Sequence, residues 1–273
     1  MLDSKKENLE QILKRLRSVL VAFSGGVDST FLLKTAVDVL GHGKVLAVTA
    51  TSLTYPTSEL DEARRIAKRL GASHMTIESE ETDIPEFVSN PPNRCYYCKR
   101  ELFSKLSHIA KERGFAVVVD GSNLDDRSDY RPGRRAAEEI GIRSPLMEAG
   151  LTKADIRELS RLSGLQTWDK PALACLSSRF PYGTEILPEK LKQVGEAEQF
   201  LRSKGFRQIR VRHHDHMARI EIEQTEMKRF FDESLMAEVV AELKRIGYKY
   251  VTLDLEGYRT GSMNEVLPIS THD

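Results

Sequence analysis

The fold is decided by residues 19–33, which read VLVAFSGGVDSTFLL. Five apolar residues lead straight into Ser24-Gly25-Gly26, and the apolar pattern then changes to the spacing of a helix. The stretch therefore predicts a buried strand, a tight turn and the start of a helix. Glycines allow positive φ and close approach of the backbone, and the first N–H groups of a helix have no partner within it. We expect such a turn to bind an anion, above all a phosphate group.

Polar side chains in the same turn strengthen the prediction of a phosphate site. Ser24 and Ser29 add hydroxyl donors, and Asp28 can hold a cation. A bare Ser-Gly-Gly can also be a turn that only reverses the chain, but the full string SGGVDS argues against that alternative. The chain has neither a G-x-x-x-x-G-K-[ST] motif nor a G-x-G-x-x-G motif after a strand, which disfavours kinase-type and dehydrogenase-type chemistry.

The string SGGVDS resembles the PP-loop of the N-type ATP pyrophosphatases, a family that includes GMP synthetases, NAD synthetases and tRNA-thiolating enzymes. The resemblance implies that ATP is cut between its α- and β-phosphates and that a substrate is adenylated. It also implies that Ser24, Gly25, Gly26, Asp28 and Ser29 hold the nucleotide, with Mg²⁺ at or near Asp28.

Composition excludes several other classes of protein. The chain has 273 residues, of which 40% are hydrophobic, so it can bury a core of one large domain or two smaller ones. Lysine plus arginine equals aspartate plus glutamate at 41 each, which disfavours a general nucleic-acid binder. Neither a long apolar run nor a signal peptide is evident, so we expect a cytoplasmic protein that is not in a membrane. Three cysteines in such a chain predict thiols for metal or sulfur chemistry rather than disulfides.

Strands and helices alternate through the first two thirds of the chain. The apolar patterns predict strands at 19–23, 44–49, 73–77 and 116–119, and helices at 9–16, 57–70 and 97–113 in addition to the one after the PP-loop. This order predicts an α/β fold with a doubly wound parallel sheet, whose ligand lies beyond the carboxyl ends of the strands.

Two further groups of residues belong to the predicted nucleotide site. Asp125 and Asp126 follow the strand at 116–119, in a loop that by itself could be a plain turn. Beside a PP-loop, the loop resembles the Gly-Thr-x-x-Asp-Asp segment that this family places next to the nucleotide. Thr49, at the end of the second strand, is a further candidate.

A second domain is predicted after an ordered connector. Residues 168–183 contain two prolines, a glycine and the only tryptophan, and we place the boundary near Pro181, which gives domains 1–180 and 181–273. Beyond it the patterns predict helices at 188–204 and 225–246 and strands at 208–213, 217–223 and 249–255. These elements predict a small α+β domain with a largely antiparallel sheet.

The cysteines suggest a metal or sulfur centre. Cys95 and Cys98 lie three apart at a predicted helix start, which places both sulfurs on one side. A dithiol redox pair and a zinc site with a histidine are open alternatives. Three thiolates can also hold a [4Fe–4S] cluster with one iron open, provided that Cys175 comes near the pair.

Four motifs extend the resemblance over nearly the whole chain. Together with the PP-loop, residues 93–99, 125–133, 170–179 and 257–264 resemble LarE, a family of sulfur transferases in nickel-pincer nucleotide biosynthesis. The resemblance implies that ATP and Mg²⁺ adenylate a carboxylate of pyridinium-3,5-biscarboxylic acid mononucleotide, and that sulfur then displaces AMP to give a thiocarboxylate.

The same resemblance implies two possible sulfur sources. In one branch a single cysteine at the position of Cys175 gives up its sulfur and becomes dehydroalanine. In the other, three cysteines bind [4Fe–4S] and an additional sulfide on the open iron is the donor. Cys95, Cys98 and Cys175 match the second branch. The resemblance further implies a homo-oligomer, namely a hexamer, and sulfide or a sulfur carrier as the partner that supplies sulfur.

A basic strand is the second predicted anion site. Arg210 and Arg212 alternate with apolar residues at 208–213, so they share one face, which could also be a solvated face. The resemblance implies that these arginines bind a phosphate at a subunit interface with Ser178, next to Arg179. We expect His213, His214 and His216 to be polar histidines of a turn, and residues 258–262 to be structural or part of an interface.

Two rival functions come from other classes. A PP-loop ligase that delivers ammonia would leave the cysteines idle, and no glutaminase segment is evident. A sensor would bind AMP without cleaving a nucleotide, and pyrophosphate release in the presence of substrate would exclude it.

Overall fold

The computed structural model describes residues 2–55, 57–127, 132–171, 174–259 and 261–266. The chain forms two compact units. The first comprises Met1–Ile84 and Asn93–Leu173, and the second comprises Pro85–Pro92 and Ala174–Asp273.

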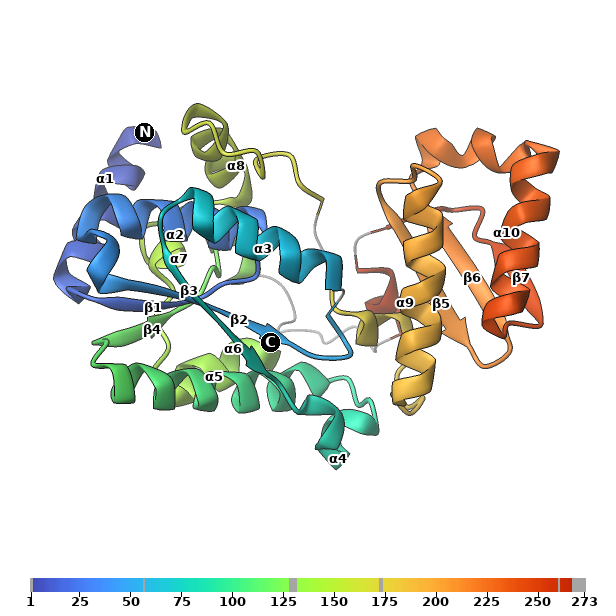
Figure 1. The fold of residues 1–273 in the computed structure, drawn as a ribbon, viewed down its shortest axis with the longest axis horizontal. Helices are drawn as coiled ribbons and strands as arrows, with labels where there is room; N and C mark the ends of the chain where they lie inside the picture. Colours follow the sequence, from blue (N-terminus) through green and yellow to red (C-terminus); the bar gives the residue numbers. More distant parts are fainter. Residues whose placement is uncertain (1, 56, 128–131, 172–173, 260, 267–273) are drawn as a thin grey trace, which may run out of the picture. The chain divides into compact units, whose positions relative to one another are not determined.

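A four-stranded parallel sheet forms the centre of the first unit. Its strand order is β3-β2-β1-β4, and Val19 of β1 lies opposite Val45 of β2 and Val117 of β4. Helices α2 and α3 cover one face and α5 covers the other (Figure 1). The strands are β1 (Val19–Ala22), β2 (Val45–Thr51), β3 (Ser73–Glu78) and β4 (Val117–Val119). The predicted α/β fold with a parallel sheet is confirmed.

Burial on both faces explains why these strands are continuously apolar. Val19 and Val21 pack into the core under α1, α2 and α3, whereas Leu20 packs on the opposite face with Phe103 and Leu106 of α5. Alternate side chains of a strand point to opposite faces, so both sets must be apolar when helices cover both faces.

The helices of the first unit follow the predicted order. The pattern Thr152-x-x-Asp155 in the sequence is typical of a helix N-terminus, and the structure forms a capping box there, at the start of α8. Helix α5 begins at Arg94, three residues before its predicted start, so both Cys95 and Cys98 lie in its first turns. The α-helices are α1 (Leu2–Leu16), α2 (Val27–Leu40), α3 (Thr57–Arg69), α5 (Arg94–Arg113), α6 (Pro132–Ile140), α7 (Pro145–Glu148) and α8 (Lys153–Leu162), and the 3₁₀ helices are η1 (His42–Lys44), η2 (Glu81–Asp83) and η3 (Leu124–Arg127).

The second unit has a three-stranded mixed sheet. Strand β5 (Ile209–His214) pairs antiparallel with β6 (Met217–Ile222), and β6 pairs parallel with β7 (Tyr250–Leu253). The expectation of a largely antiparallel sheet is therefore wrong. Helix α10 (Glu233–Ile246) lies between β6 and β7 in the sequence and returns the chain to the same end of the sheet, which makes the second pair parallel.

A short segment from earlier in the sequence belongs to this second unit. Residues 85–92 include α4 (Pro85–Val88), and the Val88 and Asn90 carbonyls accept hydrogen bonds of 2.9 Å from the Ile186 and Gly183 N–H groups. The remaining helices of the unit are α9 (Pro188–Ser203), η4 (Leu176–Arg179), η5 (Gln224–Phe231) and η6 (Ser262–Val266). Within the described parts of the chain, no helix is both long and apolar enough to span a membrane.

Candidate functional site

The PP-loop joins the carboxyl end of β1 to α2, and its polar groups converge. The Ser24 and Ser29 hydroxyls lie 3.0 Å apart, and the Gly26 N–H donates to Ser24 Oγ at 3.4 Å. Gly26 is the N-cap of α2 in an extended conformation, and as a glycine it has no side chain that could cap the helix. The first N–H groups of a helix have no acceptor within it, so those of α2 can donate to an anion bound at the loop.

Glycine is required in the loop for steric reasons. Gly25 has a φ of 67°, and a Cβ built there would lie 3.2 Å from the Ala63 backbone of α3. Gly121, in the loop after β4, would place a Cβ only 3.0 Å from the Ser29 N atom. The loop after β4 therefore lies directly against the PP-loop, as the sequence predicts for the carboxyl ends of parallel strands.

Asp28 provides one carboxylate oxygen that fits a cation. Its Oδ2 atom lies 2.6 Å from Lys153 Nζ, whereas its Oδ1 atom is buried and has no hydrogen-bond partner among the described residues. Mg²⁺ prefers carboxylate oxygens as protein ligands. Asp125 belongs to the same group, because its Oδ2 atom accepts a hydrogen bond of 2.8 Å from the Lys153 N–H group.

Two other predicted residues make contacts within the fold. Asp126 is buried, and its Oδ2 atom accepts a hydrogen bond of 2.9 Å from the Asn123 N–H group. Thr49 is also buried, and its hydroxyl donates to the Phe23 carbonyl at 2.8 Å. These contacts stabilise the loop and the strand end, and a role for either residue in nucleotide binding stays a prediction.

The two cysteines of α5 are accessible. Cys95 is exposed and Cys98 is half-buried, and neither forms a disulfide in the described structure. Gly133 of α6 permits close packing here, since a Cβ would lie 3.2 Å from the Cys95 carbonyl oxygen and 2.8 Å from Lys99 Cγ.

Cys175 has an exposed side chain on a fixed backbone. Its carbonyl oxygen accepts hydrogen bonds from Ser178 N at 3.1 Å, Ser178 Oγ at 2.8 Å and Arg179 Nη1 at 3.1 Å. Cys175 belongs to the second unit, whereas Cys95 and Cys98 belong to the first. In the residues that the structure describes, no group of three or more His, Cys, Asp or Glu side chains is arranged to hold a metal ion.

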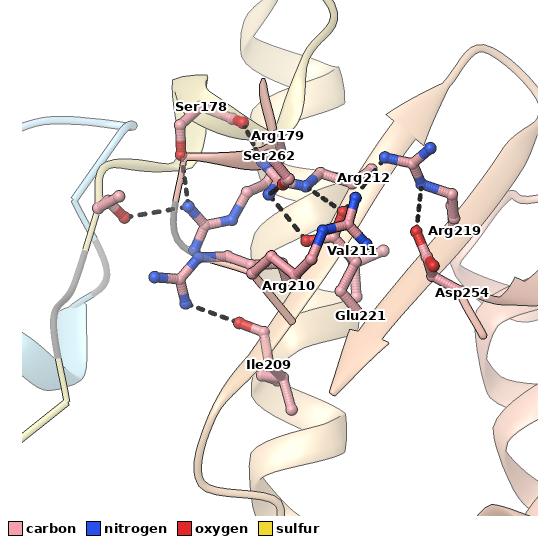
Figure 2. Close-up of polar contacts among 12 residues, drawn as sticks. Ser178, Arg179, Ile209, Arg210, Val211, Arg212, Arg219, Glu221, Asp254 and Ser262 are labelled. Atoms are coloured by element: carbon pink, nitrogen blue, oxygen red, sulfur yellow. Dashed lines mark hydrogen bonds and ion pairs between the residues drawn. The ribbon is translucent and has the colours of Figure 1, made fainter. Parts of the chain in front are cut away.

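The side chains of Arg179, Arg210 and Arg212 lie together, next to Ser178 (Figure 2). Arg179 is 1% exposed and donates to both carboxylate oxygens of Glu198, at 2.6 and 3.0 Å. Arg212 forms the same two-bond arrangement with Glu221, at 2.9 and 2.7 Å, and its Nη1 atom donates to the Ser178 carbonyl at 2.7 Å. We refer to Arg179, Arg210 and Arg212 as the arginine cluster.

Arg210 lies in the same cluster, and the contacts described next are with a backbone carbonyl and an aromatic ring. It is 4% exposed, its Nη1 atom donates to the Ile209 carbonyl at 2.7 Å, and its guanidinium carbon lies 5.0 Å from the centre of the Tyr258 ring. Burial, followed by repulsion from Arg179, lowers the pKa of Arg210 to about 10. An anion bound beside the cluster would offset this repulsion. The alternative of a solvated strand face is wrong, because both faces of β5 are buried.

One predicted turn residue belongs to the core instead. His213 is 1% exposed, and its ring lies 5.1 Å from that of Phe180 and 5.7 Å from that of Tyr248. Burial is the main reason that its pKa falls to about 4. The expectation of a polar turn histidine is therefore wrong for His213, because β5 extends to His214 and the turn comprises only Asp215 and His216.

Several residues that support these sites are not among the predicted site residues, although Lys170 lies in the 170–179 motif. Tyr55 and Lys170 contact PP-loop carbonyls, and Glu198 and Glu221 neutralise the arginine cluster. Only the tertiary fold brings them to their partners. Tyr258 and Ser262 were expected to be structural, and Ser262 Oγ accepts a hydrogen bond of 2.8 Å from Arg212.

Comparison with known proteins shows similarity over nearly the whole chain. The family profile described as NAD synthase matches residues 2–105. The pyridinium-3,5-bisthiocarboxylic acid mononucleotide synthase of Lactiplantibacillus plantarum is 43% identical over 266 residues, which cover 97% of this chain and 96% of the relative. A Synechocystis protein described only as uncharacterized is 48% identical over 98% of this chain and 99% of its own length.

A more distant relative shares only part of the chain. The tRNA-specific 2-thiouridylase MnmA of Rhizobium leguminosarum is 31% identical over 192 residues, which cover 54% of this chain and 47% of the relative.

Proposed function

Because the chain belongs to the LarE family of PP-loop proteins, we propose that it converts a carboxylate of pyridinium-3,5-biscarboxylic acid mononucleotide to a thiocarboxylate. Like the other members of its family, it is an enzyme that uses ATP to adenylate its substrate. A carboxylate resists attack because its negative charge is delocalised, and adenylation gives it AMP as a leaving group. Pyrophosphate leaves in the first step, and sulfur displaces AMP in the second.

One observation carries the first step: the start of α2, whose N-cap is a glycine without a capping side chain, lies beside two serine hydroxyls. The N–H groups at the start of α2 and the hydroxyls of Ser24 and Ser29 would hold the departing pyrophosphate. Their positions are fixed before the reaction, so charge that develops during cleavage of the α–β bond is stabilised without rearrangement.

Asp28 would hold Mg²⁺ through its Oδ1 atom, which is buried and has no partner among the described residues. Bound Mg²⁺ would supply positive charge to the phosphates of ATP. Lys153, which lies 2.6 Å from Asp28 Oδ2, is already in place to orient this carboxylate. Asp125 accepts a hydrogen bond from the same lysine residue and would join the nucleotide site from the loop after β4.

Arg210 and Arg212 of the arginine cluster would bind the phosphate of the mononucleotide substrate, with Ser178 as a further donor. Support comes from the burial of Arg210 and Arg212, which strengthens electrostatic attraction, and from the mutual repulsion that lowers the pKa of Arg210. Arg179 would hold the backbone of Cys175 in place rather than contact the substrate, because it donates to the carbonyls of Ala174 and Cys175. We propose that the first unit carries out adenylation. The second unit, which begins at Ala174 rather than near Pro181 and also includes Pro85–Pro92, would bind the phosphate and form the oligomer.

Cys95, Cys98 and Cys175 would hold a [4Fe–4S] cluster, which when bound would supply the sulfur. The donor set fits, because the cysteines provide three thiols with accessible side chains outside disulfides. The alternative is that Cys175 alone gives up its sulfur and becomes dehydroalanine. Sulfide or a sulfur carrier would be the external source, in a cytoplasmic homo-oligomer that the family resemblance implies to be a hexamer.

Anaerobic purification tests the sulfur source. We expect iron and acid-labile sulfide in the purified protein, and loss of both in Cys95→Ala, Cys98→Ala and Cys175→Ala. All three variants should also lose sulfur transfer while retaining substrate-dependent release of pyrophosphate. Absence of iron from every anaerobic preparation, with loss of the mass of H₂S from the protein after one turnover, would instead identify Cys175 as a sacrificial donor.

A further inference from the structure

Two carbonyl groups of the PP-loop accept hydrogen bonds from side chains outside the loop. The Tyr55 hydroxyl donates to the Ser24 carbonyl at 2.8 Å, and Lys170 Nζ donates to the Gly25 carbonyl at 3.3 Å. We propose that Lys170, assisted by Tyr55, is a positioning residue that holds the PP-loop peptides in their anion-binding orientation. This inference rests on the proposed function, because it assigns a task in the loop that binds ATP.

The geometry of the peptide bond explains how a contact to a carbonyl can orient a donor. In a planar trans peptide, the C=O of one residue and the N–H of the next point in opposite directions. A hydrogen bond to the Gly25 carbonyl therefore fixes the direction of the Gly26 N–H, which points toward Ser24 Oγ at 3.4 Å. The same relation connects the Ser24 carbonyl to the Gly25 N–H. Glycine peptides rotate easily, so these groups need external contacts to stay aligned.

The Lys170 side chain is mostly buried and is held by two ion pairs. Its Nζ atom lies 2.8 Å from Glu59 Oε2 and 2.6 Å from Glu62 Oε2, and its side chain is 12% exposed. Both carboxylates belong to α3, the helix whose Ala63 contacts Gly25. Since two carboxylates neutralise the ammonium group, Lys170 acts as a cross-link between α3 and the loop rather than as a free positive charge.

The backbone of Lys170 is fixed from the opposite side. Arg157 of α8 donates to the Trp168 carbonyl at 2.8 Å and to the Lys170 carbonyl at 3.0 Å. The lysine therefore connects three elements of the first unit: the PP-loop, α3 and the segment anchored to α8.

A buried carboxylate holds the residues just before Tyr55. Glu81 is 2% exposed, and its Oε1 atom accepts hydrogen bonds from Ser52 Oγ at 2.5 Å and from Thr54 Oγ1 at 2.6 Å, which fixes the segment that ends at Tyr55. Burial, followed by the charges of Glu59 and Glu62, raises the pKa of the Tyr55 hydroxyl. The hydroxyl therefore stays protonated and remains a donor to the Ser24 carbonyl.

Hydrogen exchange of the PP-loop tests the proposal without requiring turnover. Lys170→Met removes the donor with little change in length, and Lys170→Arg keeps a donor. In the full-length protein without nucleotide, we expect Lys170→Met to speed exchange in a peptide covering residues 23–31 by at least about tenfold, the lower limit for one hydrogen bond to a charged group. Lys170→Arg should restore at least part of the protection.

A matched control distinguishes the loss of the contact with the PP-loop from the loss of any lysine that is paired with two carboxylates. Lys105 also contacts two carboxylates, Glu80 at 2.9 Å and Glu101 at 2.7 Å, and donates to a backbone carbonyl, that of Glu78, at 2.9 Å. Lys105→Met should leave exchange of the PP-loop unchanged. Tyr55→Phe provides a second, milder variant, for which we expect exchange about threefold faster.

Binding of α,β-methylene-ATP, which cannot be cleaved, provides the second readout. We expect a Kd about tenfold higher for Lys170→Met and a change of less than about twofold for Lys105→Met. Wild-type exchange and affinity in both Lys170→Met and Tyr55→Phe would overturn the proposal. If these variants behave as expected while the wild-type protein releases no pyrophosphate with substrate, the proposed function fails and the positioning role stands.

Discussion

The PP-loop and the arginine cluster are both suited to bind anions, but they are built in different ways. The PP-loop uses backbone N–H groups, two hydroxyls and a glycine with positive φ. The arginine cluster uses buried guanidinium groups, two of which are paired with the buried carboxylates of Glu198 and Glu221. One site depends on the shape of a short segment, and the other depends on a balance of buried charges.

This difference determines what each site tolerates. A backbone site loses function when its conformation changes, even if the unit remains folded. A site of buried charges loses stability first, because an ion without its partner is costly to keep away from water. Substitutions in the two regions should therefore separate into effects on ligand binding and effects on unfolding.

Glu198→Gln should have the largest effect. Glu198 is fully buried and accepts hydrogen bonds from Arg179, from Arg202 at 2.8 Å and from the Val211 N–H at 3.1 Å. Its neutralisation leaves buried arginine charge uncompensated, which should cost about 3–5 kcal/mol in the free energy of unfolding of the second unit. Hydrogen exchange in urea measures the two units separately.

The control for that prediction is Glu238→Gln, which removes an ion pair with Lys204 on the surface. Its cost should stay below about 1 kcal/mol. Equal losses in Glu198→Gln and Glu238→Gln would refute the importance of charge balance inside the cluster.

Acid should destabilise the second unit through His213. The pKa of its ring is about 4 when folded, and an unfolded histidine titrates near 6.5, so only the unfolded chain takes up this proton between those values. The contribution to stability is present above pH 6.5 and is lost as the pH falls to about 4, by up to about 3 kcal/mol.

His213→Leu removes this titration, so its free energy of unfolding should change less between pH 6.5 and 4 than that of the wild type. The measurement is urea unfolding at a series of pH values. Identical pH dependence in the two proteins would mean that His213 does not account for the acid sensitivity.

Gly25→Ala should have the smallest effect on stability and a clear effect on binding. The positive φ of 67° costs about 1–2 kcal/mol for a residue with a Cβ, and the contact with Ala63 must also relax. Gly114→Ala is the matched control, with a φ of 73° and nothing within 4 Å of the added Cβ. Calorimetric titration should show weaker binding of α,β-methylene-ATP, by about tenfold or more, only for Gly25→Ala. Equal affinities in the two variants would contradict a backbone-built site.

The same contrast explains how much the sequence could predict. The parallel sheet, the strand, turn and helix start around the PP-loop, and the capping box of α8 follow from contiguous patterns, and the structure confirms these elements. The parallel pairing of β6 with β7 was missed, although the helix predicted between these two strands is the crossover connection that parallel neighbours need.

The burial of the arginine cluster could not be predicted. Alternation along β5 predicted that Arg210 and Arg212 share a face, but the carboxylates that make burial possible come from α9 and β6. Lys170 likewise contacts Gly25, 145 positions earlier in the sequence. Such contacts between distant residues leave no local pattern.

One anaerobic reaction with the wild-type protein, ATP, Mg²⁺, sulfide and pyridinium-3,5-biscarboxylic acid mononucleotide tests the whole account. Pyrophosphate and the thiocarboxylate product are quantified together, the latter by mass spectrometry. We expect pyrophosphate to appear only with the mononucleotide, in equal amounts with newly formed thiocarboxylate groups. Bound nucleotide without any pyrophosphate would contradict the account and indicate a sensor, and pyrophosphate release with ammonia giving an amide would indicate a ligase.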